Sequence, residues 1–320
     1  MQGTFFSIRT SPARKAVVAK RYLYMTAALA VALLGGGATG AGAQTLRWKL
    51  KPGEVLHYTL DTKQAANFKV MGRDKKSSRS HTINLSWTVK SVSATADAEI
   101  ALKFDRIRMR IEQPPFVPLQ FDSSPNKLEI PEEFESAERQ IKALAGAEFS
   151  FELRPNGAVD HLKIPDQTLK NLREGAGPDA GGQGGISEQG LKDMLLQSSP
   201  PSFPAESLEP GKSWANKPSR ISAPGLGTLV VDQVYAFQGP DPKDAKMLLI
   251  GMEARVALEP AQDVTAKIRA QEGKGNLTFD SESGRIVSSR VSQKMEMVIS
   301  DRGQDLVQTT ETTSTMMLDH

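Results

Sequence analysis

Apolar and polar residues alternate strictly along much of the chain after residue 44. Between Ile83 and Lys90, every second position is apolar and the positions between are polar. Successive side chains of a β-strand point to opposite faces, so this pattern predicts a strand with one buried face. Similar runs begin at Leu56, Ile100, Phe149, Leu229, Leu248, Leu277, Val291 and Val307. The pattern predicts a β-rich α+β fold, with long antiparallel strands forming a curved sheet, half-barrel or sandwich.

One of these runs changes phase in its middle. The alternation that includes Ile100 and Phe104 resumes one residue out of register at Ile107. A slip of one residue turns all later side chains to the other face, so we predict a β-bulge at Asp105–Arg106. The threonine-rich run at 307–318 is predicted to form a strand with an exposed or edge face, because threonine favours strands.

A few short helices are expected in the middle of the chain. Pro131 is followed by acidic residues, which favour the first turn of a helix, and Asp166 is expected to cap a second helix. A third is expected from Ser187. The expected buried residues are Phe134, Ala137, Ile141 and Leu144 or Ala145, then Leu169 and Leu172, then Leu191, Met194 and Leu195. The glycine-rich residues 175–185 and the proline-rich residues 198–210 are predicted to be irregular.

The two halves of the chain share a plan. Each opens on a similar turn, Lys51-Pro52-Gly53-Glu54 or Glu209-Pro210-Gly211-Lys212, and closes on a hairpin, at Asn156-Gly157 or Ser283-Gly284. Duplication and coincidental β patterning both remain open explanations. We divide the chain into a signal peptide (1–43), a first β unit with one helix (44–165), a helical and Gly/Pro-rich connector (166–208) and a second β unit (209–320).

The N-terminus has the three parts of a secretory signal peptide. Five basic and no acidic residues precede an apolar run from Leu23 to Leu34, and small residues follow as far as Ala41-Gly42-Ala43. A membrane span needs about 20 apolar residues, which is longer than this run. We therefore predict cleavage after Ala43, export to the periplasm or beyond, and no membrane span after removal of the signal.

Charge and cysteine content narrow the expected partners. The whole chain has 40 basic and 37 acidic residues, a net charge of +3; the signal removes five basic residues and leaves 277 residues with a net charge of −2. The excess of basic over acidic residues therefore comes from the signal peptide, and we expect no nucleic-acid partner. The absence of cysteine excludes disulfides, thiolate metal sites and a cysteine-linked lipid anchor.

The sequence lacks the common catalytic motifs. The four histidines, at 57, 81, 161 and 320, include no pair at the i, i+4 spacing of a helical metal site. His57 and His161 are predicted to be solvated strand side chains. No Gly-x-Ser-x-Gly elbow occurs, and Gly211-Lys212-Ser213 lacks the rest of a phosphate-binding loop. We assign no catalytic, cofactor-binding or metal-ligating residue and expect no cofactor.

Two groups of carboxylates leave an enzymatic alternative open. The acidic residues from Glu132 to Glu138 are explained by the start of a helix, where negative charge is stabilising. The segment from Asp280 to Gly284 has alternating oxygen ligands but lacks the EF-hand loop, and it is typical of a polar turn. A carboxylate-dependent hydrolase would need two carboxylates about 5 to 10 Å apart, one with a raised pKa.

Four segments carry a resemblance to known families. They are Leu46-Arg47-Trp48-Lys49-Leu50-Lys51-Pro52-Gly53-Glu54, Phe151-Glu152-Leu153-Arg154-Pro155-Asn156-Gly157, Pro210-Gly211-Lys212-Ser213-Trp214, and Phe279-Asp280 leading to Gly284-Arg285. Together they resemble an uncharacterised family of secreted proteins, of unknown function, from planctomycete-type bacteria. The plan of long strands with helices in the middle more distantly resembles the half-barrel of periplasmic lipoprotein carriers. That second resemblance implies acyl-chain binding in an apolar concavity; the chain lacks a lipobox cysteine, and no site residue carries over.

These observations predict an exported, non-enzymatic binding or interaction protein. Its expected partner is an apolar small molecule or lipid, or another envelope protein, bound against a long antiparallel sheet. The carboxylate-dependent hydrolase is one alternative. A structural envelope component, whose sheet edges pair between molecules, is another. Ligand identity, oligomeric state and strand order are left open by the sequence patterns.

Overall fold

The computed structural model describes residues 42–70, 73–115, 117–124, 135–176, 188–197, 200–223, 225–262, 264–301 and 304–319. Most of the predicted signal peptide, residues 1–41, lies outside this set. So do residues 131–134 at the predicted start of the first helix, the predicted start of the third helix at Ser187, and most of the glycine-rich stretch. None of the described helices is long and apolar enough to cross a membrane.

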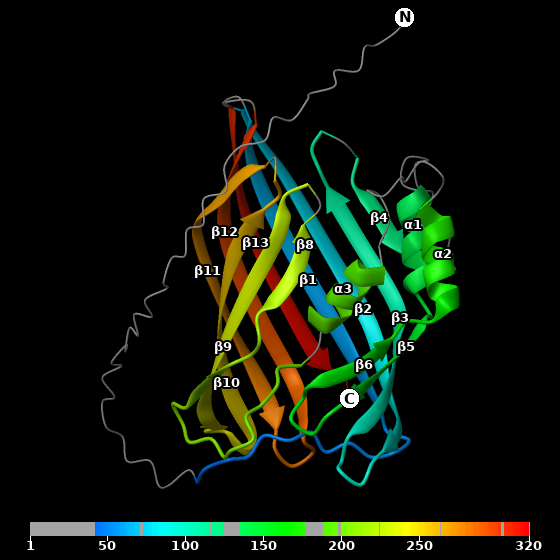
Figure 1. The fold of residues 1–320 in the computed structure, drawn as a ribbon, viewed down its shortest axis with the longest axis vertical. Coiled ribbons are helices and arrows are strands. Elements are labelled where there is room, and N and C mark those ends of the chain that lie inside the picture. Colours follow the sequence, from blue (N-terminus) through cyan, green and yellow to red (C-terminus); the bar gives the residue numbers. More distant parts are fainter. Residues whose placement is uncertain are drawn as a thin grey trace, which may run out of the picture. The chain divides into compact units, whose positions relative to one another are not determined.

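The described residues form 13 strands and three helices (Figure 1). The strands are β1 (Val55–Val70), β2 (Arg73–Val92), β3 (Ala98–Glu112), β4 (Leu119–Asp122), β5 (Glu148–Leu153), β6 (Val159–Lys163), β7 (Ser213–Ala215), β8 (Ser219–Ala223), β9 (Gly227–Asp241), β10 (Asp244–Pro260), β11 (Thr265–Asp280), β12 (Arg285–Asp301) and β13 (Gln304–Leu318). The helices are α1 (Glu135–Leu144), α2 (Asp166–Ala176) and α3 (Glu188–Gln197).

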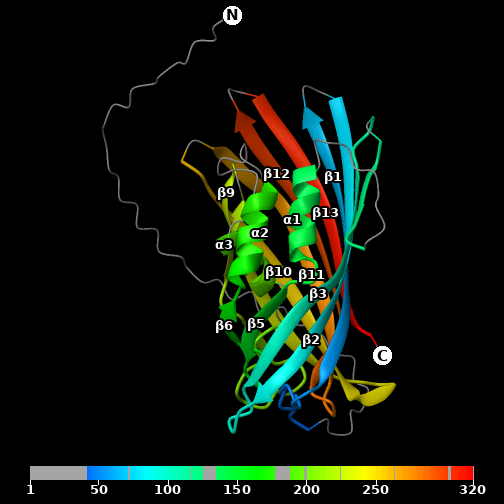
Figure 2. The ribbon, with the colours of Figure 1, turned by 90° about the vertical axis from the view of Figure 1, so that its right-hand side faces the viewer.

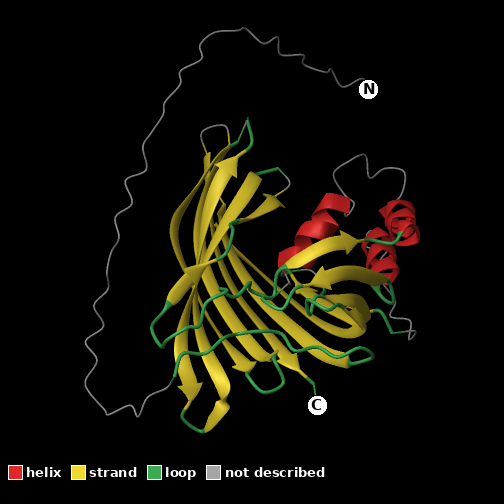
Figure 3. Ribbon diagram, turned by 60° about the horizontal axis from the view of Figure 1, so that its bottom comes forward, coloured by secondary structure: helices red, strands yellow, loops and turns green. Residues whose placement is uncertain are grey.

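All 13 strands belong to one antiparallel sheet. Its order is β6-β5-β3-β2-β1-β13-β12-β11-β10-β9-β7, with β4 also paired to β3 and β8 to β9. Residues 44–165 supply β1 to β6 and residues 209–320 supply β7 to β13, and the two sets meet where β1 pairs with β13. The sheet is curved, and the helices lie on its concave side (Figures 2 and 3). The predicted β-rich fold with a curved antiparallel sheet is confirmed.

The predicted bulge in β3 is present. Arg106 pairs with Asn84 of β2, whereas Phe104 pairs with the next residue of β2, Leu85, so Asp105 has no partner in the ladder. Phe104 and Ile107 are both buried. The bulge therefore absorbs the change of phase and keeps the apolar residues before and after it on one face.

The described helices follow the predictions, with two corrections: α2 continues through Gly175 to Ala176, which were predicted to be irregular, and Leu169 is only partly buried. Leu144 of α1, Leu172 of α2, and Leu191 and Leu195 of α3 are all buried in the main core. Residues 200–212 contain no regular helix or strand, as their prolines predicted. The apolar sides of the helices thus pack toward the concave face of the sheet.

The edge position expected for the threonine-rich run is wrong. Its strand, β13, lies in the middle of the sheet between β1 and β12. Ser314 of β13 shares a hydrogen bond with Thr62 of β1, with 3.0 Å between the hydroxyl oxygens. Thr312 accepts one from Gln64 Nε2 at 3.5 Å. Hydroxyl residues in this strand therefore make cross-strand polar contacts inside the sheet.

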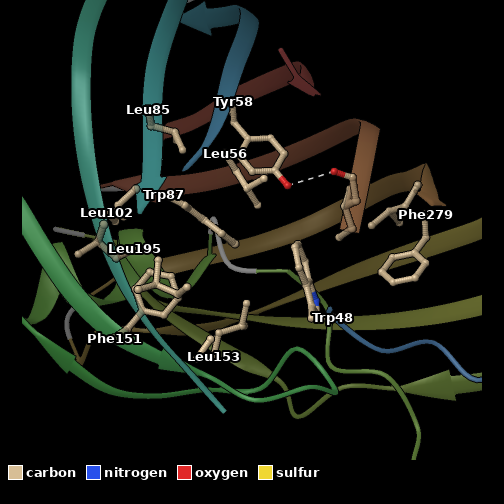
Figure 4. Close-up of a cluster of buried hydrophobic side chains, with 14 of the residues drawn as sticks. Trp48, Leu56, Tyr58, Leu85, Trp87, Leu102, Phe151, Leu153, Leu195 and Phe279 are labelled. Atoms are coloured by element: carbon tan, nitrogen blue, oxygen red, sulfur yellow. Dashed lines mark hydrogen bonds between the residues drawn. The ribbon is translucent and has the colours of Figure 1, made fainter. Parts of the chain in front are cut away.

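A cluster of aromatic rings lies at the centre of the core (Figure 4). The ring of Trp87 is 5.5 Å from those of Tyr58 and Phe151 and 5.8 Å from that of Trp48, centroid to centroid. Tyr58 donates a hydrogen bond to the backbone carbonyl of Ile286 at 3.1 Å. Aromatic pairs at such separations are stabilising, and the buried phenol has its polar partner. This cluster, which we call the aromatic base, connects β1, β2, β5 and β12 in the core.

Candidate functional site

A cavity of about 400 Å³ lies on the concave side of the sheet. Its sheet wall comes from β1, β2, β3 and β9 to β13, and its opposite wall from β5, β6, α3, Pro200 and Pro201. We call β5, β6, α3 and the segment 200–203 the cover. The hydrophobic lining residues are Tyr58, Leu60, Ile83, Leu85, Trp87, Leu102, Phe104, Phe151, Val159, Leu162, Leu195, Pro200, Pro201, Tyr235, Met252, Leu277, Ile286, Val291 and Met316. Small-molecule sites commonly have this size and a mostly apolar lining.

The strand register aligns the inner-face residues of β2, β1 and β13 in rows. In order along the strands, the rows are Leu85, Tyr58 and Leu318; Ile83, Leu60 and Met316; His81, Thr62 and Ser314; and Arg79, Gln64 and Thr312. The cavity is lined by members of the first three rows. The inner-face side chains of these strands are therefore apolar in the first two rows and polar in the third.

The polar groups in the lining are mostly paired with one another. Besides the pair of Thr62 and Ser314, the Tyr235 hydroxyl donates to Gln233 Oε1 at 3.2 Å. Burial raises the pKa of Tyr235 to about 12, so its phenol is neutral at physiological pH. Among the described residues that line the cavity, none is Asp, Glu, Lys or Arg. The wall thus offers hydrogen-bonding groups without a fixed charge.

His81 contributes an imidazole ring to the sheet wall of the cavity. The sequence patterns had assigned it no role. Burial lowers its pKa, Arg79 lowers it further, and Asp61 acts in the opposite direction. The ring is therefore neutral at neutral pH. The sequence pattern could have placed His81 on this wall. The alternation of Ile83 and Leu85, continued back by one step, puts position 81 on the same face of the strand.

The turn between β5 and β6 holds the cover in place. Asn156 accepts a backbone hydrogen bond from Phe203 at 2.6 Å, and Pro155 accepts one from Trp48 at 2.7 Å. Gly157 has a φ of +87°, and a Cβ on it would lie 2.5 Å from the carbonyl oxygen of Pro201. The turn predicted from Asn156-Gly157 is thus confirmed, and its glycine allows residues 200–203 to approach closely.

The carboxylates of the hydrolase alternative have other partners. Glu135 pairs with Arg139 at 3.2 Å and Glu138 with Lys142 at 2.5 Å along α1, while Glu132 and Glu133 lie outside the described residues. Burial alone would raise the pKa of Asp280, but hydrogen bonds from Ser283 and from backbone N–H groups outweigh it and lower the pKa. Asp280 therefore lacks the raised pKa that a general acid would need.

The other histidines lie away from the cavity lining. His57 and His161 are exposed, as predicted, and the His161 ring nitrogen is 3.4 Å from Glu152 Oε2. His320 lies outside the described residues. Within the described ranges, no three side chains of His, Asp or Glu come together in a way that could hold a metal ion.

Comparisons with known proteins identify a shared fold but no family. No protein-family model matches the chain, and no curated protein matches it. The structure described as "Lipid-protein interactions in lipovitellin" matches with a TM-score of 0.50 and 10% identity over 85% of this chain. The match spans 26% of the lipovitellin chain, about a quarter of its length. It shows a similar fold at low sequence identity.

A second match is DynF from the dynemicin biosynthesis pathway of Micromonospora chersina. It covers 89% of this chain and 92% of that chain at 10% identity, with a TM-score of 0.22. A score this low supports no structural argument. Of these two matches, the lipovitellin match is the one that bears on the fold.

Proposed function

We propose that the protein is an exported, non-enzymatic binding protein that holds the acyl chain of a lipid in the cavity. The observation that carries the proposal is the cavity of about 400 Å³, bounded by a mostly apolar sheet wall and an apolar cover. Transfer of apolar surface from water into such a site is favourable. The similarity of the fold to lipovitellin, whose structure concerns lipid–protein interactions, also supports it.

The size of the cavity suits a single long chain. An engineered apolar cavity of about 150 Å³ binds benzene, which has six carbon atoms, so about 400 Å³ offers room for a chain of roughly 16 carbons. Each buried methylene contributes about 0.8 kcal/mol before the costs of binding. A linear chain can extend from the polar row at His81 toward the aromatic base at Trp87.

The edges of the sheet favour a lipid over a partner strand as the ligand. The edge strands β4, β6, β7 and β8 have four, five, three and five residues. Short edge strands leave few free backbone groups for another chain to pair with. Binding in the concave cavity is therefore better supported than strand addition. The structural envelope alternative requires strand addition.

The proposed location is the periplasm or the extracellular space. The signal-like residues 1–43 support it. Fusion of residues 1–43 to a reporter enzyme that is active only after export tests this part of the proposal. Export of the reporter is expected, and retention of the fusion in the cytoplasm would contradict it.

Binding is tested with a pair of variants on neighbouring positions of β12. Val291 lines the cavity, whereas Arg290 points to the opposite face of the sheet. We expect native mass spectrometry of delipidated protein mixed with hexadecanoic acid to show one bound chain in the wild type and in Arg290→Trp. Val291→Trp fills the cavity and should lose the adduct while remaining folded by circular dichroism. An adduct of equal strength in Val291→Trp would overturn the proposal.

A further inference from the structure

We infer that the bound lipid is a single-chain amphiphile with an anionic headgroup, of which a fatty acid is the simplest, and that Arg79 and His81 receive this headgroup. The inference rests on the proposed function and adds the chemical class of the ligand and its orientation. The chain would point toward Trp87, and the headgroup would lie at the polar rows of β2, β1 and β13.

The first support is the position of the polar groups relative to the apolar wall. His81, Thr62 and Ser314 line one end of the cavity, and the next row beyond it contains Arg79, Gln64 and Thr312. Thr62 is already paired with Ser314, and Gln64 with Thr312. A ligand that is apolar throughout would leave the imidazole of His81 facing hydrocarbon, which costs free energy, whereas a ligand with a polar end would bond to this ring and to Arg79.

The second support is the distribution of charge between the two faces of the sheet. The carboxylates of β1, β2 and β13 are Asp61, Asp74, Asp305 and Glu311, and each is out of phase with the cavity-lining residues of its strand. Asp61 accepts a hydrogen bond from Thr82, and Glu311 pairs with Lys294, both on the outer face. These three strands therefore present no carboxylate on the inner face.

Arg79 supplies positive charge on that inner face. It alternates with His81 on β2, and its cross-strand partners are Gln64 of β1 and Ile111 of β3. Its guanidinium is exposed and forms no ion pair with any described residue. A guanidinium binds a carboxylate or phosphate through two parallel hydrogen bonds. The neutral imidazole of His81 can donate one more.

Two ligands with the same alkyl chain and different headgroups separate the contribution of the headgroup to the affinity from that of the chain. Hexadecanoic acid and 1-hexadecanol compete for a fluorescent fatty-acid probe on delipidated full-length protein at pH 8, where the carboxyl group is ionised. We expect the acid to bind about tenfold more tightly than the alcohol, the value of a charge-assisted hydrogen bond. Arg79→Gln should bring this ratio close to one and leave the affinity for the alcohol unchanged.

Arg290→Gln removes the same charge from the outer face of β12 and should keep the wild-type ratio. Equal affinities of the wild type for acid and alcohol would overturn the headgroup assignment, and so would a ratio that Arg79→Gln leaves unchanged. In both cases the alcohol still binds and the proposed function stands. If neither compound displaces the probe, the proposed function itself is wrong.

Discussion

Substitution of Gly157 by alanine should both destabilise the protein and weaken lipid binding. Two separate costs arise. The backbone at this position has a φ of +87°, and the new Cβ would lie 2.5 Å from the Pro201 carbonyl oxygen and 3.2 Å from Trp48 Nε1. The left-handed conformation costs about 1 to 2 kcal/mol for a residue with a Cβ. Displacing the Pro201 backbone adds about 1 to 3 kcal/mol, the usual cost of overpacking.

Gly53→Ala is the matched control for this prediction. Gly53 has a φ of +81°, but its Cβ would meet no atom within 4 Å, so only the conformational cost applies. We expect a loss of about 1 to 2 kcal/mol in the free energy of unfolding for Gly53→Ala and about 2 to 5 kcal/mol for Gly157→Ala. Urea denaturation followed by tryptophan fluorescence measures both values.

The two glycine variants should also differ in ligand affinity. Residues 200–203 carry Pro200 and Pro201 in the cavity wall, and a shift of this segment opens the cover. Gly157→Ala should therefore bind hexadecanoic acid more weakly than the wild type, whereas Gly53→Ala should bind it normally. Equal losses of stability in the two variants, or unchanged affinity in Gly157→Ala, would refute the reasoning that the turn holds the cover.

Two more predictions follow from the lining of the cavity. Shortening a saturated fatty acid from 16 to 14 carbons should weaken its binding by about 1.6 kcal/mol, about 15-fold, in isothermal titration calorimetry; an affinity independent of chain length would contradict an enclosed acyl site. The pKa of His81 is lowered by burial and by Arg79, against the opposing effect of Asp61, so the unfolded chain binds this proton more readily. The stability that the neutral ring contributes is present above about pH 6.5 and is lost as the pH falls through the folded-state pKa. His81→Gln should therefore lose less stability than the wild type on acidification from pH 7 to 5 in thermal denaturation, and parallel profiles would contradict this role.

Local patterns in the sequence predicted most of the individual elements. The period of two along β2 and β3 is a direct consequence of strand geometry, so the change of phase at Asp105 could be interpreted as a bulge. The Asn156-Gly157 turn was also predictable, because glycine readily adopts a positive φ. Each of these features depends on residues close together in the chain.

Strand order depends on contacts that no local pattern specifies. Thr62 and Ser314 share a hydrogen bond although they are 252 positions apart. The pairing of β1 with β13 places the threonine-rich strand at the centre of the sheet, and this is why the edge prediction was wrong. Similar turns also occupy different places, since Lys51-Pro52-Gly53-Glu54 precedes the central β1 and Glu209-Pro210-Gly211-Lys212 precedes β7 at an edge.

The candidate site was predicted only as a general apolar concavity. Its apolar wall follows from the alternation in β1, β2 and β3, but the cover depends on where α3 and residues 200–203 pack. Leu144 of α1 and Leu172 of α2 contribute to the core, and Leu195 of α3 belongs to the core and also lines the cavity. His81 and Arg79 acquire a common role only through their rows with β1 and β13.

Photo-crosslinking tests the central claim most directly. Delipidated protein is loaded with a fatty acid that carries a diazirine near the end of its chain, irradiated and digested, and the labelled residues are identified by mass spectrometry. The account predicts labels on cavity-lining residues such as Leu60, Leu102 and Leu195, and their loss when unlabelled hexadecanoic acid is in excess. Labels confined to outer-face residues such as Arg290 and Thr313, or labels that the competitor does not reduce, would contradict a lipid site in the cavity.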